Sequence, residues 1–103
     1  MKKVFRLMVV VFILSLVLGC AGELRREYYE NGKLKSEIHY KNNEKNGSYK
    51  FYYDNGRVKV KGNYKNGKLE GKVKEYDENG KLKEEFIYQG GREIKRKSYE
   101  RRE

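Results

Sequence analysis

The chain has 103 residues, 39% of them charged and 37% hydrophobic, and its formal net charge at pH 7 is +10. With one cysteine it cannot form an internal disulfide, and a chain of this size has room for one small domain with a thin core. This composition excludes a disulfide-stapled fold and a large hydrophobic core.

The first nineteen residues are organised like a secretory signal. Lys2, Lys3 and Arg6 precede a twelve-residue run, 7–18, that is apolar except for one serine. A basic start, a short apolar run and a small-residue cleavage site are typical of a signal peptide. As a helix, twelve residues rise about 18 Å, well short of the roughly 30 Å hydrocarbon core of a bilayer. We therefore predict a helical signal peptide over 1–19 rather than a permanent transmembrane helix.

The segment 16–20 reads LVLGC, which resembles the bacterial lipobox, where a lipoprotein signal peptidase cuts just before the cysteine. This resemblance implies that Cys20 carries diacylglycerol and an acylated N-terminus, with palmitate as a typical chain. The alternative is a plain secretory signal, which would leave a lone thiol exposed to stray pairing in an oxidising compartment. Because two or more acyl chains give stable anchoring, we predict a lipid-anchored protein on the bacterial cell membrane or outer membrane. Residues 20–26 would be the lipidated cysteine and a short tether.

Cleavage before Cys20 would leave 84 residues with 22 basic and 15 acidic side chains, a net charge of about +7. Low apolar content and high charge favour disorder. All ten tyrosines lie in this part of the chain, and together with a strict repeat they favour an ordered structure instead.

The repeat is marked by three Asn-Gly pairs, each 24 residues from the next. Asn-Gly between runs of alternating polar and apolar residues is a strong signal for a β-hairpin. A second glycine-rich turn follows in each unit, and a fixed period of this kind indicates a stack of similar units. The three pairs are Asn31-Gly32, Asn55-Gly56 and Asn79-Gly80, and the second turns begin near Lys41, Lys65 and Gln89.

The type of turn decides which side chains share a face. A two-residue turn at Asn31-Gly32 would pair Tyr29 with Leu34, whereas a three-residue turn with Gly32 in a bulge position would pair Tyr28 with Leu34. We predict the three-residue turn, there and at Lys65-Asn66-Gly67, because it places three repeated columns on one face, with Ile38 and Phe86 beside them. The columns are Tyr28, Tyr52 and Tyr76; Leu34, Val58 and Leu82; and Tyr40, Tyr64 and Tyr88.

The opposite face would then be mainly charged. It is predicted to carry three lysines, a mixed column and a weaker apolar set: Lys35, Lys59 and Lys83; Glu37, Lys61 and Glu85; and Tyr49, Phe51 and Val73.

The predicted fold is all-β: a single-layer antiparallel meander of about three 24-residue hairpin repeats and six or seven strands over 27–99. The third unit is less regular and ends in charged residues, which is typical of a polar cap over an open sheet edge. Residues 100–103 would form a charged C-terminal tail.

The pattern Y-x-x-G-x-L followed by YKNGKLEG resembles the variant MORN repeat of bacteria, over about Glu27 to Tyr99. The resemblance implies β-hairpin repeats in an extended sheet. It also implies contact with proteins, membrane proximity or phospholipid binding, and some family members are labelled as antitoxin components. It carries no catalytic residues.

Residues for catalysis or metal binding are sparse. His39 is the only histidine, and it occupies a column filled by Asn63 and Ile87 in the other units, which is typical of a solvated strand position. We predict no enzymatic activity, no cofactor and no metal site. Because the chain is predicted to be exported, we predict no nucleic-acid partner either.

We expect the tyrosine columns to form a docking face for another protein of the envelope, with a toxin as one candidate partner. Two alternatives are that this face only packs the sheet itself, or that it is buried by self-association. Two further hypotheses are action as an antitoxin or immunity protein, and binding to an anionic phospholipid surface through the net positive charge. The candidate residues are Tyr28, Tyr40, Tyr52, Tyr64, Tyr76 and Tyr88.

Overall fold

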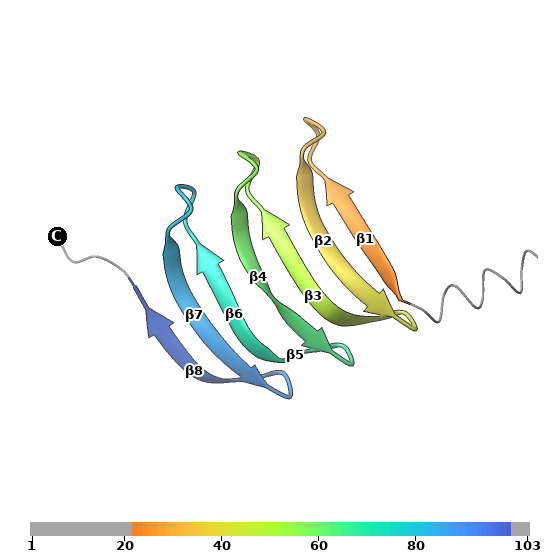
Figure 1. Cartoon of the computed structure of the whole chain (residues 1–103), viewed down its shortest axis with the longest axis vertical. Helices are drawn as coiled ribbons and strands as arrows, with labels where there is room; N and C mark the ends of the chain where they lie inside the picture. The colour runs from red at the N-terminus through yellow and green to blue at the C-terminus, as the bar shows by residue number, and fades with distance from the viewer. Residues whose placement is uncertain (1–21, 100–103) are drawn as a thin grey trace, which may run out of the picture.

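The computed structural model describes residues 22–99, which form one antiparallel sheet in a single layer (Figure 1). No helix lies within these residues, so the predicted all-β meander is confirmed. The predicted signal peptide at 1–19, the lipidated Cys20 and the tail at 100–103 fall outside the described residues.

Eight strands occupy seven positions across the sheet. In order across the sheet they are β1, β2, β3, β4, β6, β7 and β8, and the short β5 pairs with one end of β4. β5 and β6 together act as one strand that is interrupted at Glu70. The strands are β1 (Glu23–Tyr28), β2 (Leu34–Lys41), β3 (Glu44–Tyr52), β4 (Val58–Lys65), β5 (Lys68–Leu69), β6 (Gly71–Tyr76), β7 (Leu82–Gln89) and β8 (Arg92–Ser98).

The Asn-Gly turns have the predicted three-residue geometry. The Gly32 N–H donates to the Tyr29 carbonyl at 2.9 Å, and the Tyr29 N–H donates to the Lys33 carbonyl at 2.8 Å. Gly32 has φ of 87°, a left-handed conformation that glycine adopts without steric cost. The turns at Asn55-Gly56 and Asn79-Gly80 repeat this pattern, and they lie together at one end of the sheet (Figure 1).

The opposite ends of the strands close with two-residue turns, so the three-residue turn predicted at Lys65-Asn66-Gly67 is wrong. Lys65 pairs directly with Lys68, and both intervening residues have positive φ, 51° at Asn66 and 82° at Gly67. Two positive φ values in succession give a turn whose twist matches that of the flanking strands. The equivalent turns are Asn42-Asn43 and Gly90-Gly91.

Each hairpin also contains a β-bulge that the sequence analysis did not anticipate. In the first hairpin the pair Tyr28–Leu34 is followed by the pair Glu27–Ser36, which leaves one residue of β2 without a partner. The other two hairpins show the same shift at the same position. Because side chains alternate along a strand, a shift of one residue changes which of them share a face.

The six candidate tyrosines therefore lie on two faces, not on one as predicted. The Tyr52 hydroxyl donates to Glu37 at 2.6 Å, whereas the Tyr64 ring lies 4.8 Å from the ring of Tyr49, which pairs with Ile38. Glu37 and Ile38 are successive residues of β2 and point to opposite faces. Tyr28, Tyr52 and Tyr76 share one register position, and Tyr40, Tyr64 and Tyr88 lie on the other face.

The small core lies on the face of Tyr64. Tyr49, Val73 and Phe86 are 5%, 4% and 7% exposed and belong to three different strands. Tyr49 pairs with Gly62, and a Cβ at Gly62 would lie 2.8 Å from the Tyr49 ring and 2.9 Å from a Val73 methyl carbon. Gly62 thus leaves the space that the tyrosine ring fills.

Hydrogen bonds also join successive repeats at both ends of the strands. Near the three-residue turns, the Tyr29 hydroxyl donates to the Tyr52 carbonyl. Near the two-residue turns, the Gly67 N–H donates to the Lys45 carbonyl at 2.8 Å. One unit later, the equivalent bonds join Tyr53 to Tyr76 at 2.7 Å and Gly91 to Leu69 at 3.0 Å.

We predict that Gly62→Ala lowers the free energy of unfolding by about 1–3 kcal/mol, the usual cost of overpacking a well-packed site. Chemical denaturation of the full chain measures the change. Asn63→Ala is the matched control, because Asn63 is the next residue of β4 and is exposed. Equal stability of Gly62→Ala and the wild type would contradict the packing described here.

Candidate functional site

One face of the sheet is rich in aromatic side chains, and we call it the aromatic face. The Tyr49 ring lies at its centre, in contact with the rings of Tyr64 at 4.8 Å and Phe51 at 5.8 Å. Burial raises the pKa of Tyr49 to about 12, so its hydroxyl is neutral at physiological pH. The aromatic face carries Ile38, Tyr40, Tyr49, Phe51, Tyr64, Val73, Phe86 and Tyr88.

An arginine lies at each end of the aromatic face. The Arg25 guanidinium, on β1, is 4.0 Å from the centre of the Tyr40 ring, and the Arg96 guanidinium, on β8, is 4.8 Å from the centre of the Phe86 ring. Each guanidinium also pairs with a glutamate of its own strand: Arg25 lies 3.3 Å from Glu23, and Arg96 lies 3.0 Å from Glu93. The sequence predicted that Tyr49, Phe51 and Val73 lie on the charged side of the sheet. This prediction is wrong, because all three lie on the aromatic face.

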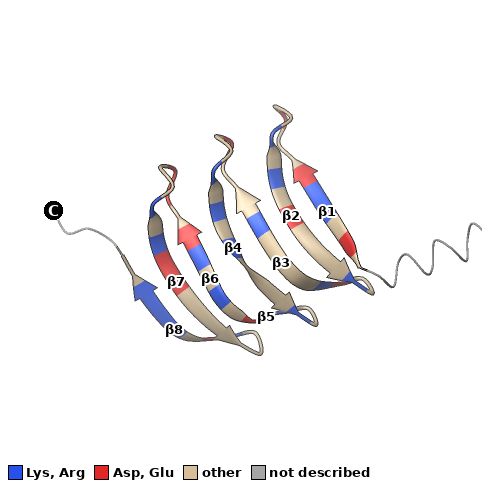
Figure 2. Cartoon of the chain, viewed as in Figure 1, with Lys and Arg blue, Asp and Glu red and all other residues tan. Residues whose placement is uncertain are grey.

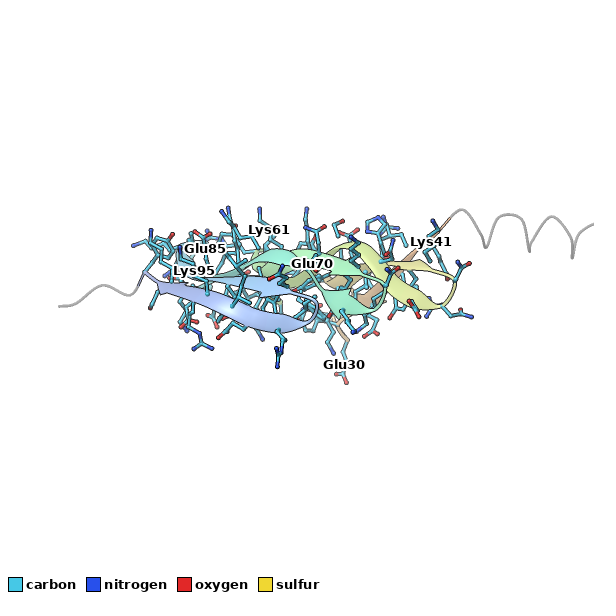
Figure 3. All side chains as sticks on the ribbon, turned by 90° about the horizontal axis from the view of Figure 1, so that it is seen from below. Glu30, Lys41, Lys61, Glu70, Glu85 and Lys95 are labelled. Atoms are coloured by element: carbon cyan, nitrogen blue, oxygen red, sulfur yellow. The ribbon has the colours of Figure 1, made fainter. Side chains whose placement is uncertain are left out.

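The opposite face, which we call the charged face, carries one row of charged residues that crosses all seven strand positions. Each member pairs directly with the next. Figure 2 shows basic residues on the central strands β3, β4 and β6 and acidic residues on β2 and β7 beside them, and Figure 3 shows Lys61 and Glu85 on the same side of the layer. The charge row is Arg26, Glu37, Lys50, Lys61, Lys74, Glu85 and Lys97.

Both carboxylates of the charge row are held by a tyrosine. Glu37 accepts a hydrogen bond from the Tyr52 hydroxyl and lies 3.0 Å from Arg26, and these contacts hold its pKa below the ordinary value of 4.5. Burial, together with this hydrogen bond, raises the pKa of Tyr52 to about 12. Glu85 accepts a hydrogen bond of 2.6 Å from Tyr99, which lowers its pKa in the same way.

The remaining tyrosine of this register, Tyr76, contacts a cation instead of a carboxylate. The Lys61 ammonium lies 5.7 Å from the centre of its ring. Tyr28, in the first unit, is 59% exposed. The three tyrosines at this register position therefore have different neighbours, although their sequence contexts are nearly identical.

His39 and Ser48 meet on the charged face. The His39 Nδ1 atom is 2.8 Å from the Ser48 carbonyl oxygen and 3.1 Å from its hydroxyl oxygen. A carbonyl oxygen can only accept, so Nδ1 donates to it and is not available as a base for the hydroxyl. Within residues 22–99 no group of three histidine, cysteine or carboxylate side chains could hold a metal ion, and no helix there is long and apolar enough to span a bilayer.

Sequence reasoning missed the residues that distinguish the two faces most clearly. Arg25 and Arg96 lie in the first and last strands, outside the repeated columns, and their stacking depends on the bulges. Lys50 and Lys74 both align with Lys61, the first through the bulged hairpin at Asn55-Gly56 and the second through the two-residue turn at Asn66-Gly67. A count of residues across each turn is the one sequence signal that could have aligned these lysines.

Lowering the pH should test the Tyr52–Glu37 contact. Because the folded pKa of Glu37 is depressed, its contribution to stability is present above pH 4.5 and is lost as the pH falls through the folded pKa. We expect Tyr52→Phe to reduce this acid-induced loss, measured as thermal unfolding of the full chain between about pH 7 and pH 3.

Tyr76→Phe is the matched control for this experiment, since Tyr76 has the same register but lies beside Lys61. Its pH dependence should equal that of the wild type. If Tyr52→Phe and the wild type lose stability in parallel as the pH falls, the Tyr52–Glu37 hydrogen bond does not set the pKa of Glu37.

A family model described as MORN repeat variant matches the chain three times, at residues 24–42, 45–66 and 69–89. Each match covers one strand pair around a three-residue Asn-Gly turn, and together they cover most of six of the seven strand positions. No curated protein and no solved structure matches the chain.

Proposed function

The chain belongs to the MORN repeat variant family, and from that premise we propose that it is a lipid-anchored envelope protein whose aromatic face binds a partner protein. MORN repeats indicate a module for contact with proteins or membranes. The finer assignment, to protein docking at a membrane, rests on the aromatic face and on the sequence around Cys20.

The aromatic face is the observation that supports protein binding. In the described residues no second layer covers it, and Tyr40, Tyr64 and Tyr88 remain partly accessible while their rings are held by neighbours. Tyrosine and arginine are enriched at the energetically important centres of protein interfaces, where a rigid ring buries area at little cost in entropy. Because these rings are already held by their neighbours, they would lose little entropy when a partner binds, which supports a role in binding.

The charges at the edges of the aromatic face define the chemistry of the partner. Arg25 and Arg96 lie on the outermost strands, six strand spacings apart, or about 29 Å. A matching partner would present an apolar ridge of that length with a carboxylate near each end, which would compete with Glu23 for Arg25 and with Glu93 for Arg96.

The predicted anchor would hold this face close to a membrane. β1 begins at Glu23, three residues after Cys20, and three residues span at most about 11 Å. A protein lipidated at Cys20 would therefore present its sheet within a short distance of the lipid headgroups, where an envelope partner could reach it.

We predict that Cys20→Ser releases the protein from the membrane fraction, because the anchor depends on acyl chains attached through the thiol. Fractionation of cells followed by a high-salt wash measures this release. Ala21→Ser changes the neighbouring residue by a similar volume and should leave the protein membrane-bound. Retention of Cys20→Ser through the salt wash would contradict lipid anchoring.

We also predict that a photoreactive phenylalanine analogue placed at position 40 or 88 crosslinks to the same single protein in intact cells. The matched control positions are 28 and 76, where tyrosines lie on the charged face, and they should give none of this product. Reversing a terminal charge with Arg96→Glu should reduce the yield from position 88 by about tenfold. Equal products from both faces, or none from position 88, would overturn the assignment of the docking face.

A further inference from the structure

Three lysines stand side by side at the centre of the charged face. Lys50 pairs directly with Lys61, and Lys61 pairs directly with Lys74, on the adjacent strands β3, β4 and β6. Directly opposed residues have Cβ atoms about 5 Å apart, and like charges at this distance repel. The sequence thus maintains an unfavourable arrangement at the middle of the sheet.

Lys61 has a lysine on both sides, whereas Lys50 and Lys74 each also pair directly with a carboxylate, Glu37 and Glu85 respectively. Lys50, Lys61 and Lys74 form no salt bridge among residues 22–99, although carboxylates end the cluster on both sides. Glu37 is held by Arg26 and Tyr52, and Glu85 is held by Tyr99 and by Lys72 at 3.5 Å. The cluster therefore keeps a net positive charge that is greatest at Lys61, and this charge is available to a ligand.

The lysines line a shallow hollow of about 200 Å³. Ser48 and Asn63 are directly paired beside the charge row and add a hydroxyl and an amide, both of which can donate hydrogen bonds. Lys72 completes the rim. Ammonium groups around a hollow, with neutral donors at its side, are the chemistry that binds phosphate oxygens.

We propose that the charged face binds a compact phosphate-bearing anion at Lys50, Lys61 and Lys74, with Ser48 and Asn63 as neutral donors. The ligand would remove the repulsion among the three lysines by neutralising them. This site lies on the opposite face from the proposed protein-docking surface and does not depend on it.

The flanking carboxylates favour a compact anion over an extended anionic surface. A flat anionic membrane laid on this face would meet Glu37 and Glu85 as well as the lysines, because all of them belong to one row. Placing like charges against each other opposes binding. A ligand confined to three strands meets only the lysines between these carboxylates.

Isothermal titration of the full chain, purified in a neutral detergent, with inorganic pyrophosphate tests the proposal. We expect saturable binding that Lys61→Gln weakens by about tenfold or more, the loss expected for one charge-assisted hydrogen bond. Lys50→Gln and Lys74→Gln should act in the same direction. Lys61→Gln should unfold at the same temperature as the wild type or higher, because Lys61 has a lysine on both sides.

Lys45→Gln is the matched control, since it removes the same charge from the same strand, β3. Lys45 lies on the aromatic face, 5.1 Å from the centre of the Tyr64 ring, so its loss should weaken binding by less than about twofold. Absence of pyrophosphate binding, or an equal effect of Lys45→Gln and Lys61→Gln, would overturn the site. Phosphatidylglycerol vesicles form the second arm: binding to vesicles that needs Lys61, without binding of pyrophosphate, would replace it with a lipid surface.

Discussion

A side chain in a single-layer sheet can be buried only by neighbours on its own face. Tyr49 meets this constraint because Gly62 has no side chain, which lets the ring lie across β4 and reach Val73 on β6. Cross-strand contacts of this kind contribute roughly 0.2–1 kcal/mol each, so the sheet depends on many of them together. The hydrogen bonds between successive repeats then fix the distance between neighbouring strands that this packing requires.

The same constraint separates the chemistry of the two faces. Rings gather on the face that contains Gly62, and the other face is left with a row of charges whose long side chains extend into solvent. Tyrosine appears on both, but in different roles. On the aromatic face it packs against other rings, as Tyr64 does, and on the charged face it orients a carboxylate, as Tyr52 does. The bulges allow a single repeat to supply both kinds of tyrosine.

The sequence predicted the elements of this fold well and the faces poorly. Asn-Gly pairs determine their own turns, because few residues other than glycine tolerate the left-handed conformation at Gly32, and the hairpins followed from that local rule. The bulge beside Tyr28 has no such marker, since Glu27 and Lys35 are ordinary strand residues. Hydrophobic alternation could not reveal the bulge either, because tyrosine and lysine occur on both faces. The unrecognised bulge in each hairpin and the two-residue turns between hairpins together moved Tyr52 and Tyr76 away from Tyr64 and Tyr88.

The odd number of strand positions gives the two edges of the sheet the same direction. Six successive antiparallel pairings separate β1 from β8, so both edge strands run the same way. If copies of the chain joined edge to edge by simple translation, β8 of one copy would have to pair with β1 of the next as a parallel pair. No described pair of strands in the sheet is parallel. With the same face upward, two copies could continue the antiparallel pattern only by pairing like edges, and at β8 this would bring together two strands that each carry Arg92, Lys95 and Lys97. Strand polarity and edge charge together limit polymerisation, so the length of the array is set by its own sequence.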